Sequence, residues 1–100
     1  MSSNILTLEY LKEKIAPVAL RYGVEEIYVF GSYARGEATS DSDVDLLVFG
    51  GKNFKPANIF VLAEEIRRIL DKEVDMFEIS EINVGSEFYE RVMEEKVLVA

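Results

Sequence analysis

Acidic side chains at three positions have the types and spacing that metal-dependent chemistry requires. Asp43 and Asp45 stand two residues apart at the beginning of an apolar segment, and Asp75 stands between Val74 and Met76 later in the chain. Residues two apart on an extended strand point to the same face of a sheet. If the segment around Asp75 forms a neighbouring strand in a suitable register, all three carboxylates converge on that face.

Such a cluster predicts a bound divalent cation, because carboxylates about 5 Å apart repel each other by roughly 3 kcal/mol at an effective dielectric constant of about 20. A solvated acidic loop is the simpler interpretation of Asp41, Asp43 and Asp45. It fits Asp45 poorly, because its neighbours are apolar and an unpaired charge in an apolar strand is costly. A calcium loop is excluded, because Leu46 stands where an EF-hand requires glycine and Lys52 where it requires glutamate.

The absence of cysteine and histidine limits the available chemistry. It excludes disulfides, thiolate metal sites, a nucleophilic cysteine and an imidazole general base. Oxygen ligands favour magnesium, manganese or calcium over zinc or copper. The formal net charge of -8 argues against long nucleic acid as a ligand, because that binding relies on Lys and Arg. A nucleotide bound through a cation remains compatible with this charge.

A glycine-serine turn, Gly31-Ser32, directly follows the apolar segment Ile27–Phe30. These residue types suit a short helix whose first amides face an anion, with Ser32 as cap or phosphate contact. An ordinary turn between two strands is the simpler alternative. A P-loop is excluded, because Glu37 stands where lysine must reach the phosphates. Arg35 fits two roles, a phosphate ligand or a partner in a structural ion pair.

Hydrophobic periodicity predicts the elements that must position these groups. Helices are expected to begin near Leu8, Ile59 and Ser86, with Pro17 kinking the first helix or splitting off its last turn and Gly23 ending it. Apolar runs predict four strands: 27–30, 44–49, 74–79 and 97–99.

The order of these elements predicts an α/β fold, a small mixed β-sheet packed with helices, with the second and third strands in one sheet. At this length a single domain over residues 1–100 is expected. The longest apolar runs, such as Ile59–Ala63, are too short to cross a membrane, so a cytoplasmic location is expected.

Gly31-Ser32, ten intervening residues and Asp43-Val44-Asp45 together resemble the Gly-Ser-x10-Asp-x-Asp signature of the DNA polymerase beta-like nucleotidyltransferase superfamily. The fuller strings 30–36 and 42–48 are similar to those of its minimal nucleotidyltransferase (MNT) branch. The resemblance implies the nucleotidyltransferase fold, which is like the palm of polymerase beta. It also implies that Gly31 and Ser32 hold the triphosphate of ATP, that Asp43 and Asp45 bind two Mg²⁺ ions, and that Asp75 is the third family carboxylate.

MNT proteins of this kind resemble antitoxins that are paired with a HEPN ribonuclease toxin. The resemblance therefore implies transfer of AMP from ATP to a toxin tyrosine, with Asp75 binding the first metal ion and deprotonating the hydroxyl, and Arg35 as a further nucleotide ligand. Two alternatives stay open: an antitoxin that masks its partner without transfer, and transfer to a small molecule or an RNA end. Either a homo-oligomer or a hetero-oligomer is compatible with the sequence.

Overall fold

A computed structural model describes residues 4–100 of the chain as a mixed four-stranded sheet with helices on both faces. The strand order is β3-β2-β1-β4; β1 runs antiparallel to β2 and β4, and β2 runs parallel to β3. The helices and strands are α1 Leu8–Arg21, β1 Glu26–Phe30, α2 Ser32–Arg35, β2 Val44–Phe49, α3 Ile59–Leu70, β3 Val74–Glu78, α4 Glu87–Glu95 and β4 Val97–Leu98, with single 3-10 turns at Pro56–Asn58 and Ile79–Glu81. The predicted α/β class with a small mixed sheet is confirmed.

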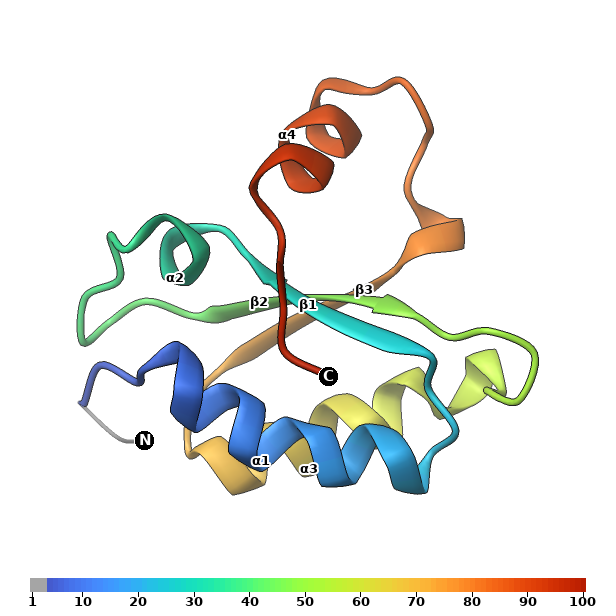
Figure 1. The fold of residues 1–100 in the computed structure, drawn as a ribbon, viewed down its shortest axis with the longest axis horizontal. Helices are drawn as coiled ribbons and strands as arrows, with labels where there is room; N and C mark the ends of the chain where they lie inside the picture. The colour runs from blue at the N-terminus through green and yellow to red at the C-terminus, as the bar shows by residue number, and fades with distance from the viewer. Residues whose placement is uncertain (1–3) are drawn as a thin grey trace.

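The two faces of the sheet are covered unequally. Figure 1 shows α1 and α3 below the sheet and the shorter α4 above it. Alternate residues of β1 and β2 point into the larger core under the sheet, where Ile27, Leu46 and Leu62 are completely buried. Burial of one such side chain contributes about 1.5 to 3 kcal/mol. The upper face has a much smaller core, built around Phe30 and Leu47, which leaves part of that face open.

Helix α1 shows how local sequence rules operate here. The Thr7 hydroxyl caps the helix by accepting a hydrogen bond from the Tyr10 N–H at 3.0 Å. The helix continues through Pro17 to Arg21, so Pro17 does not split off a last turn. Glu13, whose carbonyl loses its usual partner four residues before a proline, is exposed, so water can satisfy that carbonyl. The helix ends before Gly23, which has a φ of +69°, as the sequence predicts.

The last two strands are shorter than the sequence predicts. Strand β3 stops at Glu78 because Ile79 begins a 3-10 turn, and β4 contains only Val97 and Leu98. Val99 still donates its N–H to the Ile27 carbonyl at 2.9 Å, so the pairing of the C-terminal segment with β1 extends beyond the assigned strand. Within residues 4–100 no helix is long and apolar enough to span a membrane.

Candidate active site

The pairing of β2 with β3 brings two of the predicted carboxylates together. The parallel register places Asp45 directly opposite Asp75, so both side chains leave the upper face of the sheet, opposite to α1 and α3. Asp43 lies in the loop just before β2, two residues from Asp45, and is exposed. Its charge and that of Asp75 both act on Asp45. The structure thus brings Asp45 and Asp75 together on the upper face, with Asp43 close enough for its charge to act on Asp45.

The pKa of Asp45 is raised from its ordinary value of 3.8 to about 6. Burial is the largest cause; the negative charges of Asp75 and Asp43 and a hydrogen bond with Asp75 act in the same direction, whereas the positive charge of Arg35 lowers the pKa. The ionised form of Asp45 is therefore disfavoured in the folded chain by itself. A cation placed between these oxygens would reverse that penalty, because opposite charge favours the ionised carboxylate.

The donor chemistry at this place fits magnesium in a site completed by substrate. Among residues 4–100, no group of three or more His, Cys, Asp or Glu side chains is arranged to hold a metal ion without help. Magnesium in nucleotide sites commonly takes one or two carboxylates and fills its other positions with phosphate oxygens and water. The adjacent oxygens of Asp45 and Asp75 provide such a partial set.

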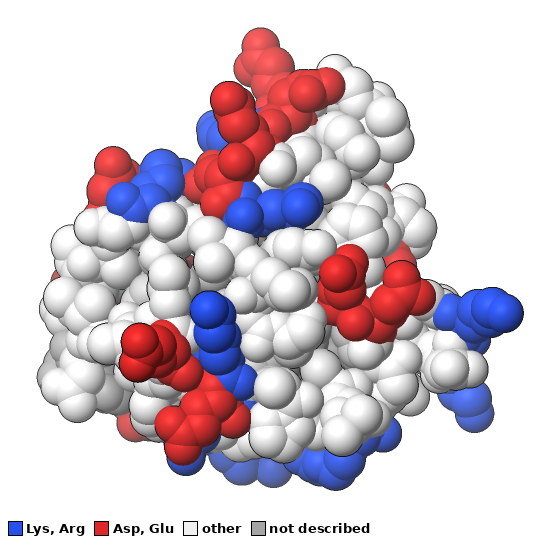
Figure 2. Space-filling view, in the orientation of Figure 1, with Lys and Arg blue, Asp and Glu red and all other residues white. Residues whose placement is uncertain are grey.

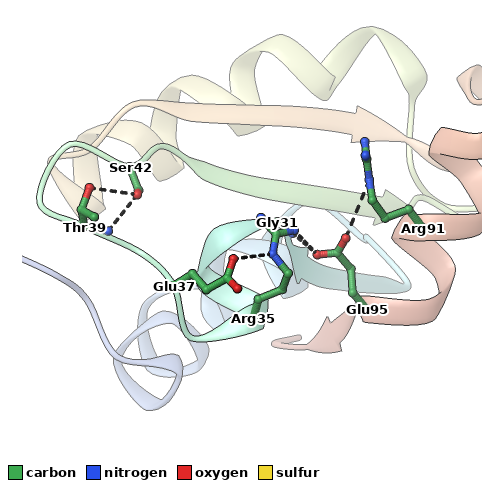
Figure 3. A network of polar contacts seen from close by, with 7 residues as sticks. All are labelled: Gly31, Arg35, Glu37, Thr39, Ser42, Arg91 and Glu95. Carbon is green, nitrogen blue, oxygen red and sulfur yellow. Dashed lines mark hydrogen bonds and ion pairs between the residues drawn. The ribbon is translucent and has the colours of Figure 1, made fainter.

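A buried lysine fixes the loop that carries Asp43. Lys72 is only 3% exposed, and its Nζ donates a hydrogen bond to the Ser40 carbonyl at 3.0 Å. Within the same loop, the Ser42 hydroxyl accepts a hydrogen bond from the Thr39 N–H at 2.8 Å (Figure 3). Because Lys72 lies just before β3, this contact ties the loop before Asp43 to the strand that carries the third aspartate.

Gly31 occupies a position that only glycine fits. It follows β1, whose last residue, Phe30, pairs with Asp45 on β2, and it caps the short helix α2 that begins at Ser32. Its backbone has φ +72° and ψ −151°, a conformation that is essentially restricted to glycine. A Cβ atom here would lie 2.3 Å from Oδ2 of Asp45. The absence of a side chain therefore lets the turn approach the carboxylate.

The turn is held by a contact that the sequence did not suggest (Figure 3). Glu95, the last residue of α4, accepts hydrogen bonds from the Gly31 N–H at 2.9 Å and from Nη1 of Arg35 at 2.7 Å. Nε of Arg35 donates to Glu37 at 2.9 Å, and Nε of Arg91 lies 4.0 Å from Glu95. The hydrogen bonds to Glu37 and Glu95 raise the pKa of Arg35. The structural ion pair considered for Arg35 is thus present, and its nucleotide-binding role stays a prediction.

A groove of about 400 Å³ lies beside the turn and reaches Asp45, whereas Asp43 and Asp75 are not among the residues that line it. It is lined by Phe30, Gly31, Ser32, Arg35, Asp45, Phe77, Phe88, Arg91 and Glu95. One wall is aromatic: the rings of Phe30, Phe77 and Phe88 contact one another with centroids 5.5 to 5.9 Å apart. Phe77 follows Asp75 by two residues on the same face of β3 and remains 37% exposed. Sequence analysis had assigned no role to this wall.

A mixed sheet with a glycine-serine turn after its central hairpin strand, beside paired aspartates on two neighbouring strands, defines a nucleotidyltransferase. The chain belongs to the polymerase beta nucleotidyltransferase family, whose model matches residues 13–100.

The relatives include proteins named for AMP transfer to proteins. The protein adenylyltransferase MntA of Thermococcus cleftensis is 43% identical over 65 residues, which cover 65% of this chain and 66% of the relative. MJ0435 of Methanocaldococcus jannaschii, named as a candidate protein adenylyltransferase, is 36% identical over 78 residues, which cover 78% of this chain and 84% of the relative. A solved structure of a tri-AMPylated Shewanella oneidensis HEPN toxin with an MNT antitoxin contains a chain that matches with a TM-score of 0.70 and 19% identity. The match covers 94% of this chain and 72% of the other, which shows a shared fold.

Asp45→Asn is expected to stabilise the metal-free protein by about 1 to 2 kcal/mol at neutral pH, after a discount for partial solvent exposure. The pKa of Asp45 is about 6 in the folded chain and 3.8 ordinarily, so its ionisation destabilises the fold above about pH 6. The advantage of the variant should shrink as the pH falls from about 6 and should vanish below about pH 3, where the carboxyl is protonated in both states. Urea unfolding across this pH range measures the difference in unfolding free energy between the variant and the wild type. Asp41→Asn is the control for an exposed acid in a loop. A difference that does not change with pH would contradict the prediction.

Gly31→Ala is expected to destabilise the protein by more than about 2 kcal/mol, because it combines backbone strain with a clash against Asp45. Gly36→Ala is the matched control: Gly36 has φ +73° but nothing within 4 Å of an added Cβ, so a cost of about 1 kcal/mol is expected. The cost at Gly31 should be smaller in an Asp45→Ala background, where the clashing oxygens are absent. Equal costs in both backgrounds, measured by chemical unfolding, would show that the predicted clash does not occur.

Proposed function

We propose that this chain is a magnesium-dependent adenylyltransferase that transfers AMP from ATP to a tyrosine hydroxyl of a HEPN-type toxin, and so serves as the antitoxin of a pair. The observation that carries the proposal is the register that sets Asp45 opposite Asp75 beside the Gly31-Ser32 turn. Membership of the nucleotidyltransferase family and the names of the relatives support the same activity.

In this proposal the nucleotide lies along the groove, with its phosphates against the turn. The hydroxyl and amide of Ser32, the turn at Gly31 and the guanidinium of Arg35 would contact the triphosphate. The oxygens of Asp43 and Asp45 would hold two magnesium ions against the phosphates, and Asp75 would share the first of them. Bound magnesium supplies positive charge that stabilises the attacking and leaving oxygens.

Asp75 is the residue best placed to accept a proton from the acceptor. It is exposed at the outer strand of the sheet, whereas Asp45, its partner across the ladder, is partly buried. A hydroxyl that gives its proton to Asp75 can attack the α-phosphorus of ATP. The new bond joins the acceptor oxygen to AMP, and the bond to pyrophosphate breaks.

Two features support a tyrosine on a protein as the acceptor. Phe77 offers an exposed ring on the same face as Asp75, where the ring of an incoming tyrosine could pack while its hydroxyl reaches the carboxylate. Acidic side chains gather over α4 in Figure 2, and the whole chain carries a charge of -8, which favours a protein acceptor over RNA. We propose the cytoplasm as the location, because ATP is available there.

Transfer is tested by incubating the chain with labelled ATP, magnesium and a HEPN toxin from the same genome. Label is expected on a toxin tyrosine, and chelation of magnesium should abolish labelling reversibly. Asp43→Asn and Asp45→Asn should each lower the transfer rate by at least about a hundredfold, because each removes a metal-binding oxygen. Asp41→Asn, in the same exposed loop, should change it less than about twofold.

Two results would contradict the proposal. If a folded chain and toxin show no label on tyrosine, the acceptor is wrong. If the Asp43→Asn and Asp45→Asn proteins still neutralise the toxin while transfer is lost, the chain acts by masking its partner.

A further inference from the structure

We propose that Glu95 is a positioning residue, which holds the Gly31-Ser32 turn and Arg35 in the arrangement that receives the triphosphate. This inference rests on the proposed function, because it assigns the groove to a nucleotide. It concerns a residue on the last helix, which comes far after the motif residues in the chain and lies against them only in the folded protein.

Three donors from two elements converge on the Glu95 carboxylate. Oε2 accepts the Gly31 N–H at 2.9 Å and Nη1 of Arg35 at 2.7 Å, and Oε1 lies 4.0 Å from Nε of Arg91. The Glu95 side chain is only 14% exposed, so these contacts are better shielded from solvent than ordinary surface ion pairs. The contact satisfies the Gly31 N–H at the point where β1 ends.

The position of Glu95 is set by the sheet. In the antiparallel pairing of β1 with β4, Tyr28 faces Leu98 and Val29 faces Val97. Glu95 is the last residue of α4 and comes two positions before Val97, so this pairing anchors the end of the helix near the end of β1. The contact therefore depends on where β4 pairs with β1, and a small shift of β4 along β1 would break it.

The same carboxylate orients Arg35 for a ligand. A guanidinium has five N–H donors, and Glu37 and Glu95 engage Nε and Nη1, which leaves the donors of Nη2 for a phosphate. Arg35 and Glu95 both line the groove. A guanidinium already held in one orientation loses less conformational freedom when it binds, which strengthens binding.

The opposite role would be competition, in which Glu95 occupies the place of a phosphate and must leave before ATP binds. The two roles predict opposite signs for the effect of removing the carboxylate. Positioning is favoured because the pairing of β4 with β1 anchors the end of α4 that carries Glu95, and because Arg35 keeps donors that Glu95 does not use.

The experiment measures the dissociation constant of a non-hydrolysable ATP analogue with magnesium by calorimetry. Glu95→Ala should weaken binding by about tenfold, since one charge-assisted contact to the ligand-binding arginine is lost. Glu95→Gln, which can still accept the Gly31 N–H, should recover part of the loss. Glu94→Ala removes an exposed carboxylate from the same helical turn and should bind like the wild type.

Two readouts separate positioning from a general structural effect. In an Arg35→Ala background the loss caused by Glu95→Ala should be smaller, because the contribution through Arg35 is absent and only the contact with the Gly31 N–H remains to be lost. In nuclear magnetic resonance spectra, the Gly31 amide proton should move upfield in Glu95→Ala and remain close to its wild-type position in Glu94→Ala.

Equal or tighter analogue binding by Glu95→Ala would overturn the positioning role and leave the proposed function intact. An unchanged effect in the Arg35→Ala background would also overturn it. If the wild-type protein does not bind the magnesium-bound analogue, the proposed function fails, and this inference fails with it.

Discussion

The constraint on which this structure depends is the placing of carboxylates side by side in a partly apolar setting. The parallel register of β2 and β3 forces Asp45 and Asp75 together, and burial together with the charges of Asp75 and Asp43 raises the pKa of Asp45 to about 6. A folded chain tolerates this only if the rest of its packing supplies enough stability. The larger core beneath the sheet provides that support, while the upper face around the aspartates stays open.

The carboxylates make the neighbouring turn selective for glycine. The hairpin pairs Phe30 with Asp45, so the residue after Phe30 must pass beside the Asp45 side chain. A Cβ at that residue would lie 2.3 Å from a carboxylate oxygen, which excludes every other amino acid without a local shift. The spacing between Gly31 and Asp45 is thus a property of a two-stranded hairpin, and it brings a turn that can contact phosphates next to oxygens that can bind a metal ion.

Local patterns in the sequence were enough to locate most elements and the three aspartates, because periodicity and turn residues act over a few positions. Pro17 does not split off a last turn, because an exposed helix face tolerates a missing hydrogen bond. The contacts of Glu95 and Phe77 at the groove were missed for a different reason, since each depends on pairing between distant segments. The pairing of β1 with β4 would have placed the end of α4 near the turn, but nothing in one sequence specifies that pairing.

The two ends of the groove differ in charge, and in the proposed function this difference favours the binding of magnesium and ATP as a unit. At one end, Asp45 and its neighbouring aspartates require positive charge. At the other end, Arg35 is bonded to Glu37 and Glu95, so its charge is already balanced in the absence of ligand. ATP without a metal ion would add negative charge beside the aspartates, and magnesium alone would lack the phosphate oxygens that complete its coordination. In the proposed function, the metal-bound nucleotide would satisfy the carboxylates and would also present phosphates to Arg35.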